Sequence, residues 1–533
     1  MKTDQQNDDR QSNDRHSNDR PSNDLHDNDL HDNDLQDPDT EREPAGLGRL
    51  LFAFVSKYLL GLILVSAVAL IPCFWHPHIE AGDLASHSYN AWLASLVGQG
   101  KAAGLSIAPQ TNNVLFDILL LRLGLILGFS AGEKIAVGAA VLVFLWGSFA
   151  LASAAAKRPA WFLLPLLVML SYGWTLQMGF FNFYLSLGLS CIGLAILWQA
   201  RGLGYLYVVP VAALIWLAHP LGMAWFAGTA LYIQAARFLK PSVQWILAPA
   251  ALGAVFLVRL YLAAHYRVSW PNGHFYDLNG SDQLFLGARY QFLSLCLILA
   301  LVGSVLLHLV ESHGATIANY FPLPLQLFVV AFLGVSLLPD SIFVPRFGEP
   351  VSLICSRFTL AVGILGACAL ANLRPKILVA VLTGAIAFAY FSFLYRDTAK
   401  TYSMEQQAQA LVSQIPQGAR VIATIFPFRN SRIFVHHVVD RACIEHCFVV
   451  DNYEPASGQF RLRASAGNRI AAADSQAANR MMLGAYVVTP EDLPLWQIFQ
   501  CGPWEVDLCL RSLQPGSLQT FTPGTIIRAR KLD

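Results

Sequence analysis

Two carboxylates and a histidine occupy one short stretch, EAGDLASHSYNAW at residues 80–92, directly after the first long apolar run. On a helix, Asp83 and His87 are four positions apart and share one face. A carboxylate at the boundary between membrane and water can take a proton from a hydroxyl group as a general base, and His87 would tune or relay that proton. The alternative is structural, because Asp is a common N-cap at the start of a helix. The spacing leaves both interpretations open.

The elements that must position this stretch are membrane helices. Of the 533 residues, 55% are hydrophobic and 13% are charged, which is about half the charged fraction of an average soluble protein. Many apolar runs are long enough to cross a hydrocarbon core of about 30 Å as helices, and lipid favours helices because it cannot satisfy exposed backbone groups. The composition therefore predicts an all-α polytopic membrane bundle. No Walker, GxGxxG, HExxH or GxSxG motif points to another class of enzyme.

The apolar runs predict eleven spans between residues 50 and 395. The spans lie near 50–74, 134–156, 160–175, 180–199, 205–219, 221–237, 243–263, 289–310, 320–338, 356–373 and 377–395. With the N-terminus in the cytoplasm, most basic residues of the short loops fall on the cytoplasmic side, as the positive-inside rule requires. Residues 114–129 are apolar but short and contain Asp117 and Arg122. We therefore expect them to form a surface helix within a first external loop, residues 75–133.

The two ends of the chain differ from this bundle. Residues 1–49 repeat Asn-Asp every five positions and hold six Lys/Arg against fourteen Asp/Glu, which predicts a disordered, acidic cytoplasmic tail. Residues 396–533 carry short β-branched runs bounded by Gly and Pro, in IPQGARVIATIFPF, FVVDNYE and GAYVVTPEDLP. These runs predict a small α/β domain. With the N-terminus in the cytoplasm, an odd number of spans places this domain on the outer side of the membrane.

Four of the nine cysteines lie in this C-terminal segment: Cys443, Cys447, Cys501 and Cys509. An even number of cysteines in a segment that faces an oxidising space is compatible with two disulfides. The sequence CIEHC also offers sulfur, carboxylate and imidazole ligands, but it lacks the second pair of ligands that a zinc site requires. We therefore favour disulfides over a metal site.

Several motifs, taken in order, resemble the GT-C superfamily of integral-membrane glycosyltransferases. GDLASH follows the first span, TNNVLFDILLLRLG lies in the external loop, MGFFNFYLSLGLSCIGLAILW and LAHPLG lie in later spans, and LVSQIPQGARVIA opens the C-terminal domain. The resemblance, to an uncharacterised bacterial branch, implies a GT-C-like bundle in a bacterial inner membrane with a periplasmic C-terminal domain. It also implies inverting transfer of a sugar from a polyprenyl phosphate to a lipid, glycan or protein acceptor at the outer face.

The resemblance also assigns roles to the acidic stretch. Asp83 matches the acidic residue of the first loop that acts as catalytic base in the superfamily, with Glu80 as the substitute and His87 nearby. We expect Asp83 to face the substrate and Glu80 to face solvent. Members differ in their use of metal, so a divalent cation is left open and no other cofactor is implied. The implied partners are the sugar donor, the acceptor and membrane lipids, with no nucleic acid.

A polyprenyl-phosphate donor needs cationic side chains near the outer face of the membrane. Arg289 and Arg357 begin spans and are the preferred phosphate contacts, although plain anchoring at the interface is the alternative for each. Lys101 in the first external loop is a further candidate.

Two polar residues within apolar segments complete the candidate binding residues. His219, directly before Pro220, either contacts the substrate or caps a helix end, and the sequence favours neither. Asn182 either lines a polar cavity or, as we favour, forms hydrogen bonds between helices. For His436 and His437 in the C-terminal domain we favour a surface or buried structural pair over a substrate contact.

Two other classes of function remain as alternatives. A multi-pass transporter or flippase usually shows charges in mid-span or paired inverted repeats, and the sequence shows no convincing repeat. A non-catalytic membrane scaffold with an external binding domain is compatible with the 138 residues, 396–533, at the C-terminus.

Overall fold

The computed structural model describes residues 47–271, 278–311, 322–373, 377–465, 467–501 and 506–516. The predicted disordered tail, residues 1–49, lies outside these residues except for its last three, which begin the first helix. The described chain is mostly helical, and its strands are short.

Six helical segments of the described chain are long and apolar enough to cross a membrane, so the protein is embedded in a membrane. They are formed by α1 (Leu47–Phe74), α4 (Phe129–Ala156), α7 (Phe181–Gln199), α10 (Leu247–His265), α11 (Ala288–Glu311) and α15 (Ile377–Val412). A single turn of 3₁₀ helix, η3 (Gln244–Ile246), leads into α10.

The other predicted spans form shorter or less apolar helices, so the predicted count of eleven spans is not confirmed. These helices are α5 (Leu164–Ser171), α6 (Trp174–Gln177), α8 (Val208–Ala218), α9 (Pro220–Phe238), α13 (Leu323–Val335) and α14 (Ile354–Leu370). Local breaks explain part of the difference, because α5 and α6 separate at Gly173 and α8 ends where Pro220 begins α9. Proline cannot continue a helix that precedes it without losing a hydrogen bond.

Helices α4 and α7 form the centre of the bundle, where small residues allow the two backbones to approach closely. A Cβ atom added to Gly147 would lie 2.4 Å from the carbonyl oxygen of Gly188, so neither position accepts a larger residue without movement. Directly beside this contact, the rings of Phe144 and Tyr184 stack with their centroids 4.5 Å apart.

The C-terminal segment contains a four-stranded sheet with the order β5-β4-β7-β8, in which only the β7–β8 pair is antiparallel. The strands are β4 (Arg420–Thr424), β5 (Phe448–Val449), β7 (Leu495–Gln500) and β8 (Leu508–Ser512). The accompanying helices are α16 (Val438–Ala442), α17 (Glu454–Ser457) and α18 (Ser475–Met482). The predicted C-terminal sheet region is present, although GAYVVTPEDLP forms no strand and ends in the 3₁₀ turn η6 (Pro490–Asp492).

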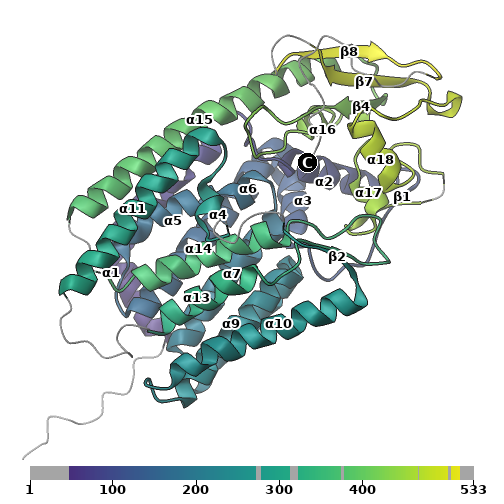
Figure 1. Ribbon diagram of the computed structural model, residues 1–533. Coiled ribbons are helices and arrows are strands. Elements are labelled where there is room, and N and C mark those ends of the chain that lie inside the picture. Colours follow the sequence, from purple (N-terminus) through teal and green to yellow (C-terminus); the bar gives the residue numbers. More distant parts are fainter. Residues whose placement is uncertain are drawn as a thin grey trace, which may run out of the picture.

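The C-terminal segment and residues 75–133, the predicted first external loop, form one layer at the end of the bundle (Figure 1). The loop contains α2 (Leu84–Gly98), β1 (Leu105–Ile107) and α3 (Leu115–Leu127), and β1 pairs antiparallel with β6 (Leu462–Ala464) of the C-terminal segment. Helix α15 passes residue 396 without a break and ends at Val412, inside this layer. The C-terminal segment is therefore joined to the bundle by a continuous helix.

Helix α3, the predicted surface helix, packs one face against the start of α4. Gly128, with a φ of +84°, separates the two helices, and a Cβ added to Gly132 would lie 2.7 Å from the backbone nitrogen of Gly124. The apolar residues Leu125, Ile126 and Leu127 at the end of α3 stay exposed. At 13 residues, α3 is too short to cross a hydrocarbon core by itself.

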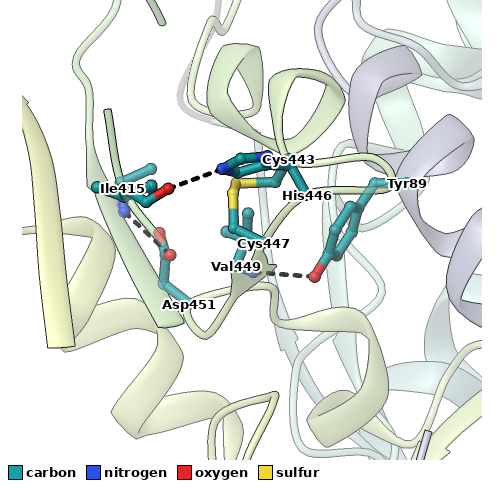
Figure 2. Close-up of a disulfide and its surroundings, with 8 residues drawn as sticks. Tyr89, Ile415, Cys443, His446, Cys447, Val449 and Asp451 are labelled. Carbon is teal, nitrogen blue, oxygen red and sulfur yellow. Dashed lines mark hydrogen bonds between the residues drawn. A yellow bond between two sulfur atoms is a disulfide. The ribbon is translucent and has the colours of Figure 1, made fainter. Parts of the chain in front are cut away.

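The four C-terminal cysteines form two disulfides, Cys443–Cys447 and Cys501–Cys509. Figure 2 shows the first of them between α16 and β5, where the backbone N–H of Val449 donates to the hydroxyl of Tyr89 at 2.9 Å. The sulfur atoms of CIEHC are therefore bonded to each other and are not metal ligands.

Candidate active site

A cavity of ≈ 900 Å³ lies between the end of the helical bundle and the C-terminal layer. Its lining combines the helix ends around Asp83 and Asn182 with residues of the C-terminal layer such as His437 and Glu454. Apolar side chains such as Phe180 and Phe347 complete the wall. A concave site of this size with a few polar groups is typical of a site for a small or extended ligand.

Asp83 faces this cavity and does not act as a helix cap. It occupies the N-cap position of α2, but its side chain makes no capping hydrogen bond and keeps 20% of its surface exposed. The backbone N–H of Asp83 donates to the carbonyl of Met178 at 3.1 Å. Gly179 makes this approach possible, because it has a φ of +89° and a Cβ there would lie 2.5 Å from the Asp83 nitrogen. The MGFFNF motif therefore positions Asp83.

His437 is the closest ionisable partner of Asp83. Its Nε2 lies 3.8 Å from Oδ1 of Asp83, and its Nδ1 lies 3.0 Å from Oδ2 of the buried Asp440. Burial opposes a charge on this ring, but the nearby carboxylates, Asp440 first, outweigh burial and raise the pKa of His437 to about 9. At neutral pH the ring is therefore a cation held between two carboxylates. His437 is thus buried and paired, as in one of the alternatives predicted for His436 and His437, and both histidines also line the cavity.

The partner of His87 is Asp117 on α3 and not Asp83. His87 Nδ1 and Asp117 Oδ1 are 2.9 Å apart, and Asn182 donates to the other oxygen of Asp117 at 3.0 Å. Burial opposes the charged form of His87, yet Asp117 raises its pKa to about 9. Asn182 also accepts from the backbone N–H of Phe116 at 2.8 Å. Asn182 therefore both lines the cavity and joins two helices, which unites the two predicted alternatives.

Glu454 is a further cavity acid that the sequence did not single out. Its side chain accepts a hydrogen bond of 3.3 Å from the hydroxyl of Ser86 on α2. Burial raises the pKa of Glu454 to about 7, against the lowering effect of His87. Burial therefore favours the protonated form of Glu454 more than is usual for a carboxyl group, whereas the neighbouring histidines are charged.

The sequence predicted that Glu80 faces solvent, and this prediction is wrong. Glu80 also does not line this cavity. It is 8% exposed and lies with Glu405 of α15 and Glu133 of α4 around the guanidinium group of Arg441. Burial and the nearby Glu405 raise the pKa of Glu80 well above its usual value, and its protonated form shares a hydrogen bond with Glu405. The prediction for Glu80 is wrong because Asp83 occupies the N-cap position of α2 whereas Glu80 lies three residues earlier, before the helix, so the two side chains point in different directions.

We expect Glu80→Gln to leave both thermal stability and activity nearly unchanged. Glutamine has the shape of a protonated glutamate and can still donate to Glu405, so the free energy of unfolding should change by no more than about 1 kcal/mol. Thermal unfolding of the full chain at pH 7, followed by tryptophan fluorescence, measures this change. A loss of several kcal/mol would show that Glu80 is needed in its ionised form.

The predicted cationic contacts divide into one that lines the cavity and two that do not. Arg357, in the first turn of α14, lines the cavity, and its guanidinium group lies 3.9 Å from the centre of the Phe180 ring. Arg289 is absent from the lining and pairs with Asp397 at 3.2 Å. Lys101 lies in an exposed turn after α2, also outside the lining.

His219 combines the two roles that the sequence left open. Its Nδ1 accepts from the backbone N–H of Leu221 at 3.1 Å and so caps the start of α9. The ring is nearly buried against Phe183 and also lines the cavity. Because Nδ1 is an acceptor, a neutral ring carries its hydrogen on Nε2.

The site also contains cavity arginines that the sequence analysis did not single out as preferred contacts. Arg346, which precedes α14, and Arg463, on β6, both line the cavity. The described residues contain no group of three or more His, Cys, Asp or Glu side chains placed to hold a metal ion.

No family model, curated protein or solved structure matches this chain. The function therefore has to be argued from the geometry of the cavity and from the sequence.

The charged histidines give the site a stability that depends on pH. A pKa raised from 6.5 to about 9 means that each histidine stabilises the fold fully below pH 6.5, and that this stabilisation is lost as the pH rises through 9. Each contribution is on the order of 3 kcal/mol. We expect the unfolding temperature to fall between pH 6.5 and 9.5.

The variant His437→Gln should remove part of this pH dependence, whereas replacement of the exposed His265 should not. Thermal unfolding of the full chain in lipid nanodiscs at both pH values measures the difference. An identical pH slope for the wild type and His437→Gln would contradict the charged state assigned to His437.

Proposed function

We propose that this protein is a membrane glycosyltransferase that moves a sugar from a polyprenyl phosphate to an acceptor hydroxyl, with Asp83 as general base. The observation that carries the proposal is the Asp83 carboxylate, which is free of a capping role and faces a cavity of ≈ 900 Å³ at the end of the bundle. Arg357 lines the same cavity, where an arginine can hold a phosphate group.

The proposed reaction is a single inverting displacement. The acceptor oxygen forms a bond to the anomeric carbon of the sugar while the bond between that carbon and the phosphate oxygen breaks. The electron pair of the broken bond goes to the phosphate, and the acceptor proton goes to the carboxylate of Asp83. Arg357 would stabilise the negative charge that develops on the leaving phosphate.

His437 would support the base through its charge. The Nε2 of His437 lies 3.8 Å from Oδ1 of Asp83, so its positive charge would hold the carboxylate in position beside the acceptor. Asp440 holds Nδ1 of His437 at 3.0 Å and so fixes the orientation of the ring. His437 is therefore a positioning residue, and Asp83 is the group that touches the acceptor.

The proposal places the reaction at the outer face of a bacterial inner membrane, with the C-terminal layer in the periplasm. Two disulfides in that layer, Cys443–Cys447 and Cys501–Cys509, support an oxidising compartment. The distribution of basic residues among the short loops supports the same orientation.

The test uses the full chain in liposomes that contain a polyprenyl-phosphate sugar with a radiolabel in the sugar. A glycosyltransferase releases polyprenyl phosphate and moves the label to an acceptor from a membrane extract. A flippase would expose the labelled donor at the other leaflet without breaking its glycosidic bond, and a scaffold would do neither. Either of these two results, obtained across a panel of hexose and pentose donors, would contradict the proposal.

A further inference from the structure

Two cavity arginines come from segments that contact each other away from the bundle. Arg346 lies between β3 (Ser341–Phe343) and α14, and Arg463 lies on β6. The first segment bonds to the C-terminal layer through Gly348, whose N–H donates to the carbonyl of Ser457 at 2.8 Å. The backbone carbonyl oxygen of Arg346 and the Nη1 of Arg463 both lie beside Gly458, because a Cβ added there would be 3.5 Å and 4.0 Å from them. We call Arg346 and Arg463 the outer arginine pair.

The outer arginine pair carries positive charge that no carboxylate of the described chain neutralises. Neither residue forms an ion pair there, and the buried Nη1 of Arg463 has no hydrogen-bond partner among the described residues. Glu349, which lines the same end of the cavity, accepts from Asn479 at 2.8 Å instead. The unpaired guanidinium group of Arg463 is partly buried, which is unfavourable unless a ligand supplies the missing acceptor. Arg346 is exposed and adds a second positive charge at the cavity wall.

Arg357 belongs to a different part of the cavity. The Arg357 guanidinium group interacts electrostatically with Asp83 and Tyr453. The pKa of Arg463 is lowered by burial, and no charged neighbour acts on it among the described residues. A series of aromatic contacts runs from His437, beside Asp83, toward β6, which carries Arg463. The Tyr453 ring is 6.0 Å from the His437 ring and 5.8 Å from the Phe460 ring, and Phe460 lies two residues before β6.

We propose that the outer arginine pair binds an anionic group, a phosphate or a carboxylate, that is carried by the acceptor. The donor's phosphate would use Arg357, so the cavity would hold two anions at once, and this series of aromatic rings would face the sugar. The assignment of the second anion to the acceptor rests on the proposed function. A planar guanidinium fork matches both phosphate and carboxylate, so the two are named together.

The experiment measures binding of simple probes to the full chain in phosphatidylcholine nanodiscs. Glucose 6-phosphate represents the acceptor anion, with glucose as its neutral control. Farnesyl phosphate and farnesyl diphosphate represent lipid donors with one and two phosphates. The variants are the double replacement Arg346→Gln/Arg463→Gln, the single replacement Arg357→Gln, and Lys101→Gln as a control that removes one positive charge outside the cavity.

The double variant should weaken binding of glucose 6-phosphate by about tenfold or more, since it removes two charge-assisted contacts. It should leave binding of farnesyl phosphate within about twofold of the wild type. Arg357→Gln should instead weaken binding of farnesyl phosphate and leave binding of glucose 6-phosphate nearly unchanged. Lys101→Gln should bind both probes like the wild type, and farnesyl phosphate should not displace glucose 6-phosphate.

Three results would overturn the inference. One is unchanged binding of glucose 6-phosphate by the double variant, and another is equal binding of glucose and glucose 6-phosphate by the wild type. The third is selective loss of farnesyl diphosphate in the double variant, which would assign the second anion to the donor. These measurements need no sugar transfer, so the absence of transfer would contradict the proposed function separately.

Discussion

Replacing Asp83 with Asn is expected to lower the rate of sugar transfer by about 10²–10⁴-fold, the usual contribution of a general base. Asparagine keeps the shape of the side chain but cannot accept the acceptor's proton. The Asp83 side chain makes no capping hydrogen bond that the change would remove, so the variant should fold. Liposomes with the labelled donor give the rate, and thermal unfolding gives the stability.

Glu80→Gln is the matched control for this experiment. It removes a carboxyl group only three residues away in the same stretch, but that group is buried around Arg441 and is absent from the cavity lining. We expect normal transfer from Glu80→Gln and almost none from Asp83→Asn. The reverse pattern would assign the base to Glu80, and full activity in both variants would show that the base is another residue.

The residues of the site could be predicted from the sequence where the local pattern fixes their position. Asp83 could be singled out because it follows a long apolar run and begins a helix, and His219 because it precedes a proline within an apolar segment. Arg357 begins an apolar run, which places it at the end of a helix. In each case the local chemistry determines where the side chain lies.

The contacts of the site could not be predicted, because they join distant parts of the chain. His437 meets Asp83 only because α16 packs near the start of α2, and nothing in the local sequence separates His437 from His436. Local spacing even misleads: Asp83 and His87 are one turn apart, yet His87 pairs with Asp117 of another helix. The HHVVD spacing puts both histidines within one helical turn of Asp440, so it could have indicated a charged histidine but not which of the two carries the charge.

The fold shows the same limit. Apolar runs locate the helices well, since every predicted span described by the structure falls on helical segments. The number of membrane crossings does not follow from those runs, because lengths and breaks such as Gly173 depend on packing inside the bundle. The end of α15 also depends on tertiary contacts: its polar second half continues as a helix because residues such as Met404 and Ala408 are buried against the C-terminal layer.

The largest loss of stability is expected from replacing Arg441. Its guanidinium group is buried and donates to both oxygens of Glu133 at 3.1 Å, to Glu405 at 2.8 Å and to the carbonyl of Ile79 at 2.9 Å. Arg441→Met would leave these carboxylates buried without a counter-ion, which typically lowers the free energy of unfolding by about 3–5 kcal/mol. The stability of Arg441→Lys should lie between those of the wild type and Arg441→Met, because an ammonium group keeps the charge but cannot reach all of these acceptors.

A variant in which the partners of Arg441 are also made neutral shows whether Arg441→Met loses stability through unpaired charges or through the changed side-chain volume. Adding Glu133→Gln and Glu405→Gln to Arg441→Met removes the unpaired charges, so most of the lost stability should return. Arg469→Gln, which removes an exposed guanidinium group from the same layer, should change stability little. Protein level and thermal unfolding in detergent measure all of these variants.

Arg441 also affects the candidate active site, because it connects the helix that carries His437 to the segment that carries Asp83. It lies on α16, the helix whose N-cap is His437, and it binds α4, α15 and the chain segment that leads to Asp83. If the neutralised variant regains stability but not sugar transfer, Arg441 is needed to hold His437 against Asp83. If Arg441→Met is as stable as the wild type, the buried cluster does not hold the C-terminal layer to the bundle, and other contacts must fix the geometry of the cavity.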